Sequence, residues 1–214
     1  MLFAAILFGE KIKIINITQA QIHARLQQSY HQEKFPASDG YVGHPTKQRN
    51  NPLKCAAVLV PLTFYADEWH LLFTRRADTL QDHSGQVSFP GGNCDAEDGS
   101  FEQTALREAK EEIGLRAEDV QILGRINEVR TVTNYLITPV VGVFPWAYSF
   151  FVSTVEVERV FTMPLNWLAE PRHHWQFQHP KAKYPIIAFH PFDGELLWGA
   201  TARITVNFLK TILS

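Results

Sequence analysis

Residues 83–115 form the stretch on which the fold depends, and they read HSGQVSFPGGNCDAEDGSFEQTALREAKEEIGL. The alternation of polar and apolar residues over 86–89 predicts a short strand. Gly91 and Gly92 predict a turn directly after it, because glycine reaches backbone angles that other residues resist. Residues 93–99 are polar and predict a loop. The stretch therefore begins as a strand, a glycine turn and an acidic loop.

A helix is predicted after this loop. Ser100, followed three residues later by Gln103, is a capping-box pattern that predicts the first turn. Gly114 is placed to end the helix, since glycine readily adopts the left-handed conformation that follows the last helical residue. One side of the helix is apolar and can face a core. Its residues are Leu106, Ala109 and Ile113.

Another side of the same helix is acidic. Glu108, Glu111 and Glu112 are three or four residues apart, or adjacent, so they fall on one side of a helix. Like charges one turn apart repel, which weakens an isolated helix. A divalent cation would turn this defect into a site, because hard cations take carboxylate oxygens as ligands. The alternative interpretation is a solvated acidic face of a surface helix.

The order of charged residues in this helix is similar to that of a known family. Arg107-Glu108, Glu111-Glu112 and Gly114-Leu115 resemble the second half of the Nudix box, G-x5-E-x7-R-E-U-x-E-E-x-G-U, where U is apolar. The first half is longer here. Counting from Gly92 the acid is Asp98, with eight residues between it and Arg107, and counting from Gly91 it is Glu97, with nine residues between it and Arg107. Which of these two acids pairs with Arg107 is left open.

The residues before the box resemble one particular branch of this family. Residues 71–92, LLFTRRADTLQDHSGQVSFPGG, resemble the signature of the coenzyme A pyrophosphatase branch of the Nudix hydrolases. The resemblance implies an α/β fold, namely the Nudix-type α/β/α sandwich with a mixed sheet and a loop-helix-loop catalytic motif. It also implies Mg²⁺ or Mn²⁺ as cofactor. The implied reaction cleaves the diphosphate of coenzyme A or acyl-coenzyme A to 3′,5′-ADP and (acyl-)4′-phosphopantetheine.

The resemblance also implies roles for particular residues. Glu108 and Glu112 are the expected metal ligands, and Glu111 is a third ligand or a group that orients one. The expected catalytic residues are Glu111, Glu156 and Arg107, with Arg107 bracing the loop rather than touching substrate. Glu156 is the candidate general base and Glu158 the second candidate, although both could belong to a solvated strand edge.

Five further residues are candidates for binding the substrate. Arg75, Arg76 and His83 could contact the diphosphate or the 3′-phosphate, because guanidinium and imidazolium groups form strong hydrogen bonds to phosphate oxygens. Only one of the two arginines should point toward the site if they alternate along a strand. Thr131 and Thr133 could line the pocket, or could simply favour a strand.

Two other functions remain open from the sequence. One is a Nudix hydrolase that cleaves another nucleoside diphosphate derivative, such as ADP-ribose or NADH. The other is a non-catalytic Nudix-like binding module, for which a cluster of three glutamates would have no use.

The composition and the net charge limit the kinds of partner that the protein can have. The chain has 214 residues, 45% of them hydrophobic, and a net charge of -2, so no broad basic field for nucleic acid is expected. We expect a small-molecule substrate and no nucleic acid, and a homodimer is compatible with the sequence. The first nine residues, MLFAAILFG, are apolar but too short to span a bilayer, so no membrane span is expected.

The two cysteines predict the redox environment. Cys55 and Cys94 lie 39 positions apart, with no C-x-x-C motif. This usage predicts two unpaired structural cysteines and a cytoplasmic location, because a reducing cytoplasm keeps most thiols free.

The remaining pattern predicts the organisation of the chain. Residues 1–53 are predicted as an N-terminal extension, with an amphipathic helix at 18–31 and a loop, and residues 54–214 as the Nudix domain. The helix would bury Ile22, Leu26 and Tyr30. The other predicted elements are strands at 55–62, 69–74, 120–126 and 131–143, the last with an edge or break at Pro139, a surface loop at 170–184, a hairpin joining 184–190 to 195–198, and a core-facing terminal helix through Ile204, Phe208 and Ile212.

Overall fold

The structure, a computed structural model, describes residues 15–32, 54–80, 83–131, 133–178 and 185–214. The apolar segment at the N-terminus and the predicted loop over 33–53 lie outside these residues. No helix in the described ranges has the length and apolar character needed to cross a membrane.

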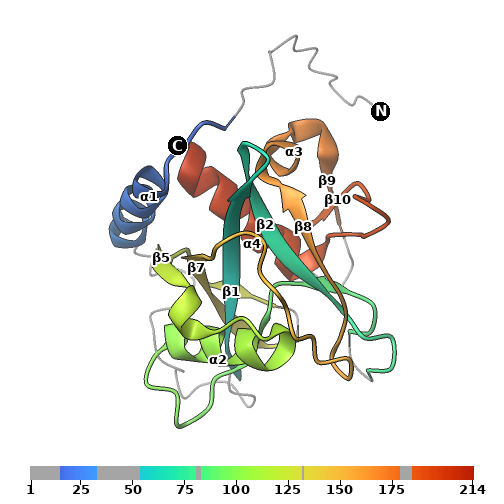
Figure 1. Ribbon diagram of the computed structural model, residues 1–214. Helices are drawn as coiled ribbons and strands as arrows, with labels where there is room; N and C mark the ends of the chain where they lie inside the picture. The colour runs from blue at the N-terminus through green and yellow to red at the C-terminus, as the bar shows by residue number, and fades with distance from the viewer. Residues whose placement is uncertain (1–14, 33–53, 81–82, 132, 179–184) are drawn as a thin grey trace, which may run out of the picture.

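A mixed sheet of eight strands forms the centre of the molecule (Figure 1). The two long strands β1 and β2 pair antiparallel, and β7 runs parallel to β1 on its other side. Short strands extend or flank this centre, with β3 and β8 on β2, β4 on β1, and β5 and β6 on β7. The strands are β1 (Lys54–Tyr65), β2 (Glu68–Arg76), β3 (Val87–Ser88), β4 (Gly91–Asn93), β5 (Gln121–Arg125), β6 (Val129–Arg130), β7 (Tyr135–Val143) and β8 (Val157–Pro164).

Helices cover both faces of the sheet. Because side chains alternate along a strand, Ala57 and Leu59 of β1 face one helical layer while Val60 and Leu62 face the other. The first layer is α2 (Phe101–Ile113). The second layer is α1 (Gln19–Gln32), the short α3 (Leu165–Ala169) and α4 (Gly199–Leu213), and Figure 1 shows α1 and α4 side by side. The predicted α/β/α sandwich with a mixed sheet is confirmed.

The ends of α2 follow the predicted capping pattern. Ser100 is the N-cap, and its side chain accepts a hydrogen bond from the backbone N–H of Gln103 at 3.3 Å. The Gln103 side chain accepts a bond from the Gly99 N–H at 2.6 Å, one residue earlier than a capping box requires. Gly114 ends the helix with φ 69°, in the left-handed region where glycine carries no steric penalty.

Pro139 corrects one expectation. It neither ends nor breaks a strand, because β7 runs through it and pairs with β1 along its whole length. On the other side of β7, pairing with β6 stops at Ile137 and pairing with β5 begins at Val140. The missing N–H of proline falls between these two partners, so no sheet hydrogen bond is lost.

The predicted hairpin near the C-terminus is wrong in its main partner. The strand β10 (Ile186–Phe189) pairs with β9 (His174–Phe177), which lies within the predicted surface loop. The turn at Asp193-Gly194 is present, with φ 51° and 82°, but among the described residues its two arms meet only in isolated bridges, between Phe192 and Glu195 and between Ala188 and Trp198. Pairing over this longer separation has no local sequence signal.

The two cysteines form a disulfide, which corrects the expectation that they are unpaired. The strand β4 lies antiparallel to β1 with Ala56 opposite Asn93, so the next pair outward is Cys55 and Cys94. Their Cα atoms are 5.5 Å apart, and the Cys94 N–H donates to the Cys55 carbonyl at 3.1 Å. The 39 positions between them conceal this contact, because the strand register sets it.

The helix α4 supports the segment that leads to the glycine turn. It is the predicted terminal helix, and it buries Ile204, Phe208 and Ile212. In its first turn, the Thr201 hydroxyl donates to the backbone carbonyl of Val87 in β3 at 3.1 Å.

The helix α1 shares the core of the sheet. Ile22 and Leu26 are fully buried in the same hydrophobic cluster as Leu123 and Phe208. Tyr30, predicted to share this buried face, is 47% exposed. The helix therefore packs on the sheet through its first half.

We expect Leu26→Ala to reduce the free energy of unfolding by about 2–5 kcal/mol, since it removes a fully buried side chain and leaves a cavity. The exposed neighbour Gln28 is the control, because Gln28→Ala should change stability by less than about 0.5 kcal/mol. Urea unfolding measures both. Equal stabilities of the two variants would contradict the packing of α1 on the sheet.

Candidate active site

The glycine turn brings the box loop against β1 and α2. Gly91 pairs with Val58 at φ 157°, and a Cβ on it would lie 2.5 Å from the carbonyl oxygen of Ala57. A Cβ on Gly92 would lie 2.5 Å from the carboxyl group of Glu108. A side chain at position 91 would clash with the backbone of β1, and one at position 92 would displace the Glu108 carboxyl group, so the two glycines allow the backbone to approach the carboxylate directly.

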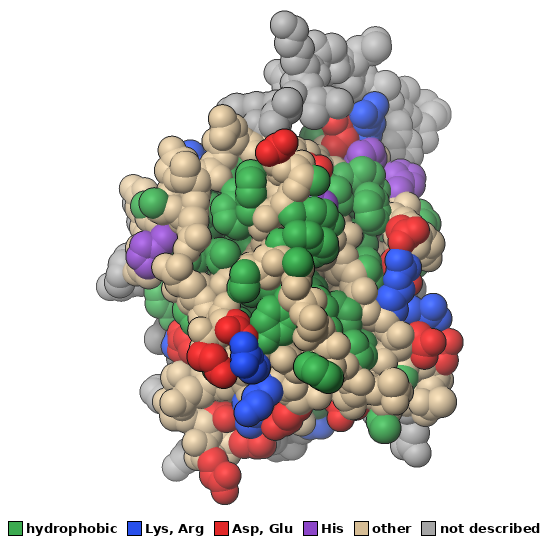
Figure 2. Space-filling model, in the orientation of Figure 1, with side chains coloured by type: hydrophobic (Ala, Val, Ile, Leu, Met, Phe, Trp, Pro, Cys, Tyr) green, Lys and Arg blue, Asp and Glu red, His purple; other side chains and the backbone are tan. Residues whose placement is uncertain are grey.

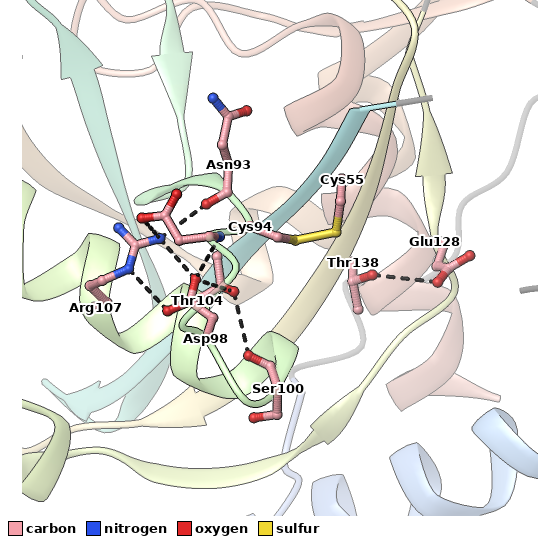
Figure 3. The surroundings of a disulfide bond; sticks show 10 residues. Cys55, Asn93, Cys94, Asp98, Ser100, Thr104, Arg107, Glu128 and Thr138 are labelled. Atoms are coloured by element: carbon pink, nitrogen blue, oxygen red, sulfur yellow. Dashed lines mark hydrogen bonds and ion pairs between the residues drawn. A yellow bond between two sulfur atoms is a disulfide. The ribbon is translucent and has the colours of Figure 1, made fainter. Parts of the chain in front are cut away.

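Arg107 joins the loop to the helix (Figure 3). Its Nε donates to Asp98 Oδ1 at 3.1 Å and its Nη2 donates to Asp98 Oδ2 at 2.9 Å, a two-bond pairing typical of arginine with a carboxylate. The Nη2 also donates to the carbonyl of Asn93 at 3.0 Å. The guanidinium lowers the pKa of Asp98 well below its usual range. Asp98, rather than Glu97, is thus the acid that pairs with Arg107.

The loop has one residue more between Asp98 and Arg107 than the box pattern, and its structure accommodates that residue before α2 begins. Asp98 also accepts a hydrogen bond from the Thr104 hydroxyl at 2.8 Å and from the Asp95 N–H at 3.0 Å. These bonds hold Asp98 over the first turn of α2, where Arg107 reaches it across eight intervening residues.

Glu112 is the buried carboxylate of the site. Only 4% of its surface is exposed, and its Oε2 has no hydrogen-bond partner among the described residues. The pKa of Glu112 is raised to about 8, chiefly by burial and also by the charges of Glu108 and Glu156, while Arg76 and a backbone hydrogen bond from Gly91 oppose the rise. A solvated acidic face does not describe this residue.

Glu108 lies between the buried carboxylate and the arginine. Burial raises its pKa, and Glu111 and Glu156 add to the rise, while Arg107 opposes it. The Arg107 Nη1 donates to Glu108 Oε1 at 2.8 Å and to Glu111 Oε2 at 3.3 Å. Glu111 itself is exposed on the outer side of the helix.

Glu156 and Arg76 complete the group. Glu156 is exposed just before β8, and its backbone carbonyl accepts from the Ala77 N–H at 2.9 Å, which ties it to the end of β2. Arg76 is half-buried at that end, and its Nε has no partner among the described residues. The structure therefore brings together Glu108, Glu112, Glu156 and Arg76.

The other predicted substrate residues make local contacts instead. Arg75 pairs with Asp78 at 3.0 Å. His83 is exposed, with its Nδ1 2.9 Å from Gln86 Oε1. The hydroxyls of Thr131 and Thr133 lie 2.9 Å apart, and Thr131 Oγ1 accepts from the Tyr135 N–H at 3.0 Å. Glu158, the second candidate base, is exposed on β8.

The sequence does not reveal two features of the site. The burial of Glu112 was not predicted, although its place beside Ile113 at the margin of the apolar side of the helix is a signal for it. The hydrogen bond from the Gly91 backbone to Glu112 was also not predicted, since it depends on how the glycine turn folds over α2.

The carboxylates fit a divalent cation by their chemistry. Within the described ranges no three His, Cys, Asp or Glu side chains are already gathered at metal-binding distances, and Arg107 holds one oxygen of Glu108. The buried Glu112 oxygen nevertheless has no partner, and neighbouring carboxylates raise the pKa of both Glu112 and Glu108. A cation between these groups would supply the missing partner and relieve the repulsion.

The chain belongs to the Nudix family, since the family model described as the NUDIX domain matches residues 54–184. It is a Nudix hydrolase, an enzyme of the pyrophosphohydrolase class. Members of this family generally use divalent metal ions, which agrees with the carboxylate chemistry of the site.

Two curated relatives carry the same family name. The chain is 37% identical over 161 residues to "Uncharacterized Nudix hydrolase NudL" of Photorhabdus laumondii, an alignment that covers 75% of this chain and 86% of the relative. It is 39% identical over 158 residues to the protein of the same name from Yersinia pestis, covering 73% and 79%. Among solved structures, a MutT/nudix family protein from Enterococcus faecalis has a TM-score of 0.52 at 16% identity, covering 89% of this chain and 69% of that chain, and supports the fold alone.

The raised pKa of Glu112 predicts how stability depends on pH. The folded-state value of about 8 exceeds the ordinary value of 4.5, so between these values the folded protein binds more protons than the unfolded one. Without metal, stability should therefore fall as pH rises from about 5 to 8, by at most about 5 kcal/mol from this group. Thermal and urea unfolding in EDTA across this range measure the slope.

Glu112→Gln should remove most of this slope and stabilise the metal-free protein at pH 8, while the exposed Glu118→Gln serves as the control. Parallel pH profiles for wild type and Glu112→Gln would show that Glu112 titrates normally.

Asp98→Asn should lower kcat/KM about 10- to 100-fold, because it breaks the charged pairing that positions Arg107 and the loop. Glu97→Gln is the matched control, since Glu97 is exposed and is the other acid allowed by the box spacing. Steady-state kinetics on both variants decide the matter. A larger loss in Glu97→Gln would reverse the assignment.

Proposed function

We propose that this enzyme hydrolyses the diphosphate of coenzyme A or acyl-coenzyme A, giving 3′,5′-ADP and (acyl-)4′-phosphopantetheine, with Mg²⁺ or Mn²⁺ as cofactor. The observation that carries the proposal is the arrangement of Glu108, Glu112 and Glu156 around the glycine turn, next to Arg76 at the end of the segment 71–92. Carboxylates beside a guanidinium suit a negatively charged diphosphate and the cations that accompany it.

Glu112 and Glu108 are the proposed metal ligands. Glu112 contributes a buried oxygen without a partner, and Glu108 contributes the oxygen that Arg107 does not hold. Glu111 is exposed beside Arg107. It is therefore better placed to orient Arg107 or a third ligand than to bind the metal ion as a buried ligand. A divalent cation held by Glu108 and Glu112 would neutralise phosphoryl oxygens and would lower the pKa of a water bound to it.

The chain's own groups supply the rest of the chemistry. Glu156 accepts a proton from the attacking water, since its carboxylate is exposed and its charge reaches both Glu108 and Glu112. Arg76 pairs with an oxygen of the diphosphate through its guanidinium, which lies close enough to Glu112 to oppose the rise of its pKa. Arg107 keeps the loop in register with α2 through Asp98 and Asn93, and it does not contact substrate.

Recognition of coenzyme A is assigned to the segment before the glycine turn. Arg75 and His83 lie on this segment and would bind the 3′-phosphate by exchanging their present partners, Asp78 and Gln86. Thr131 and Thr133 are assigned to the pocket wall through their hydroxyls, which at present close the turn before β7. A cytoplasmic location and a homodimer complete the proposal, although the cysteine pairing removes the argument from free thiols.

The alternative substrates are other nucleoside diphosphate derivatives, such as ADP-ribose and NADH. They would use the same carboxylates and differ only in contacts to the groups outside the diphosphate. A non-catalytic binding module is disfavoured by the family membership and by a buried carboxylate that weakens the metal-free fold.

A substrate panel tests the proposal. Coenzyme A, acyl-coenzyme A, ADP-ribose and NADH are each incubated with the enzyme and Mg²⁺ or Mn²⁺, and products are identified by mass spectrometry. We expect coenzyme A compounds to have the highest kcat/KM and to yield 3′,5′-ADP. Faster hydrolysis of ADP-ribose would assign the enzyme to the alternative substrates.

Glu112→Gln is the negative control for this panel, and it should lower kcat/KM at least about 100-fold on every substrate, since it removes a proposed metal ligand. Glu118→Gln, which is exposed on the loop after α2, should behave as wild type. Full turnover by Glu112→Gln at low metal concentration would remove this residue from the site.

A further inference from the structure

The disulfide anchors the loop that precedes the helix of the proposed metal ligands. Cys94 follows Gly92 and Asn93 of the glycine turn, and its partner Cys55 lies at the beginning of β1 (Figure 3). The bond links the box loop to the centre of the sheet, at the point where the pairing of β4 with β1 ends.

Both neighbours of Cys94 contact Arg107. The Asn93 carbonyl accepts from Arg107 Nη2 at 3.0 Å, and the Asp95 carboxylate lies 3.4 Å from the same nitrogen. Arg107 in turn holds Glu108 Oε1 at 2.8 Å. A displacement of Cys94 therefore reaches a proposed metal ligand through a single side chain.

The other contacts of this part of the loop are hydrogen bonds and ion pairs. The Cys94 N–H bonds to the Cys55 carbonyl, and the Asp95 side chain that meets Arg107 is 63% exposed. Exposed ion pairs contribute little to stability. Without the cross-link, the segment around Cys94 would depend on the hydrogen bonds that Asp98 and Asn93 form with Arg107.

The disulfide is open to reagents from solvent. Cys55 is exposed and Cys94 is half-buried. Both border an open depression of about 380 Å³, which is also lined by residues of the loop and of the start of α2, including Asp98, Ser100 and Phe101. Accessible disulfides exchange with thiols more readily than buried structural ones. Reduction therefore does not require the core to open.

We propose that the Cys55–Cys94 disulfide is a redox switch for the metal site, with the oxidised enzyme as the ordered, metal-binding form. A dithiol supplies the electrons. One of its thiolates attacks a sulfur of the pair and breaks the S–S bond, and the second closes the dithiol's own disulfide. Two electrons and two protons pass to Cys55 and Cys94, which become free thiols. The inference rests on the metal site of the proposed function but not on the choice of substrate.

The test compares oxidised and reduced wild-type protein. Dithiothreitol is added without denaturant and removed by desalting without air, and free thiols are counted by alkylation and mass spectrometry. Hydrogen exchange of residues 93–99 is then measured in EDTA, and Mn²⁺ binding is measured by calorimetry. We expect faster exchange in the reduced loop, unchanged exchange in α4, and an Mn²⁺ Kd weaker by about 10-fold. Oxidised glutathione should reverse both the faster loop exchange and the weaker Mn²⁺ binding.

The double variant Cys55→Ser, Cys94→Ser is the matched control. It should resemble the reduced wild type and should not respond to dithiothreitol. If this variant fails to fold, the comparison of oxidised, reduced and reoxidised wild-type protein still tests the switch.

Two results would overturn the switch: equal loop exchange and equal Mn²⁺ affinity in both redox forms, or reduction that occurs only in denaturant. An oxidised protein that binds no Mn²⁺ would overturn the proposed metal site, and the switch with it. A substrate other than coenzyme A would overturn only the substrate assignment.

Discussion

The buried carboxyl group of Glu112 is the constraint around which the site is built. A carboxylate with one oxygen lacking a partner is costly in an apolar environment, and its raised pKa records that cost. The glycine turn lies against this part of α2. It can approach so closely because Gly92 has no side chain that would collide with the carboxyl group of Glu108. Arg107 balances the remaining negative charge and ties the loop to the helix. Burial of this carboxyl group therefore lowers the stability of the metal-free protein. A cation bound to it would offset the cost of burial.

Much of this arrangement was predictable because it is local in sequence. The ends of α2, at Ser100 and Gly114, follow from capping preferences that act over three or four residues. The acidic and apolar sides of α2 follow from helical periodicity. The fold class was predicted from the resemblance to the Nudix box and not from periodicity. The helices that cover the two faces of the sheet confirm it.

What the sequence concealed depends on the pairing of distant strands. The disulfide follows from the register of β4 on β1, and the partner of β10 follows from the position of β9. Pro139 was mistaken for a break because the gap between β5 and β6 is invisible before the sheet is assembled. The choice of Asp98 as the partner of Arg107 likewise needed the three-dimensional path of the loop. Among the predicted substrate residues, Arg76 joins the carboxylates, whereas the contacts of Arg75 and His83 are local.

The bond from Thr201 in α4 to Val87 in β3 spans 114 positions, and it bears on the order in which a ribosome delivers the parts of the enzyme. The glycine turn and α2 emerge early in synthesis, with Glu112 already in place on its helix. The segment that leads into the turn can pair with β2 early, but the bond from Thr201 forms only when α4 has left the exit tunnel, about 90 residues and several seconds later at ordinary elongation rates. During that interval the nascent chain carries an acidic helix without its finished surroundings. Assembly of the site is thus one of the last events in the making of the protein, even though its charged residues are synthesised near the middle of the chain.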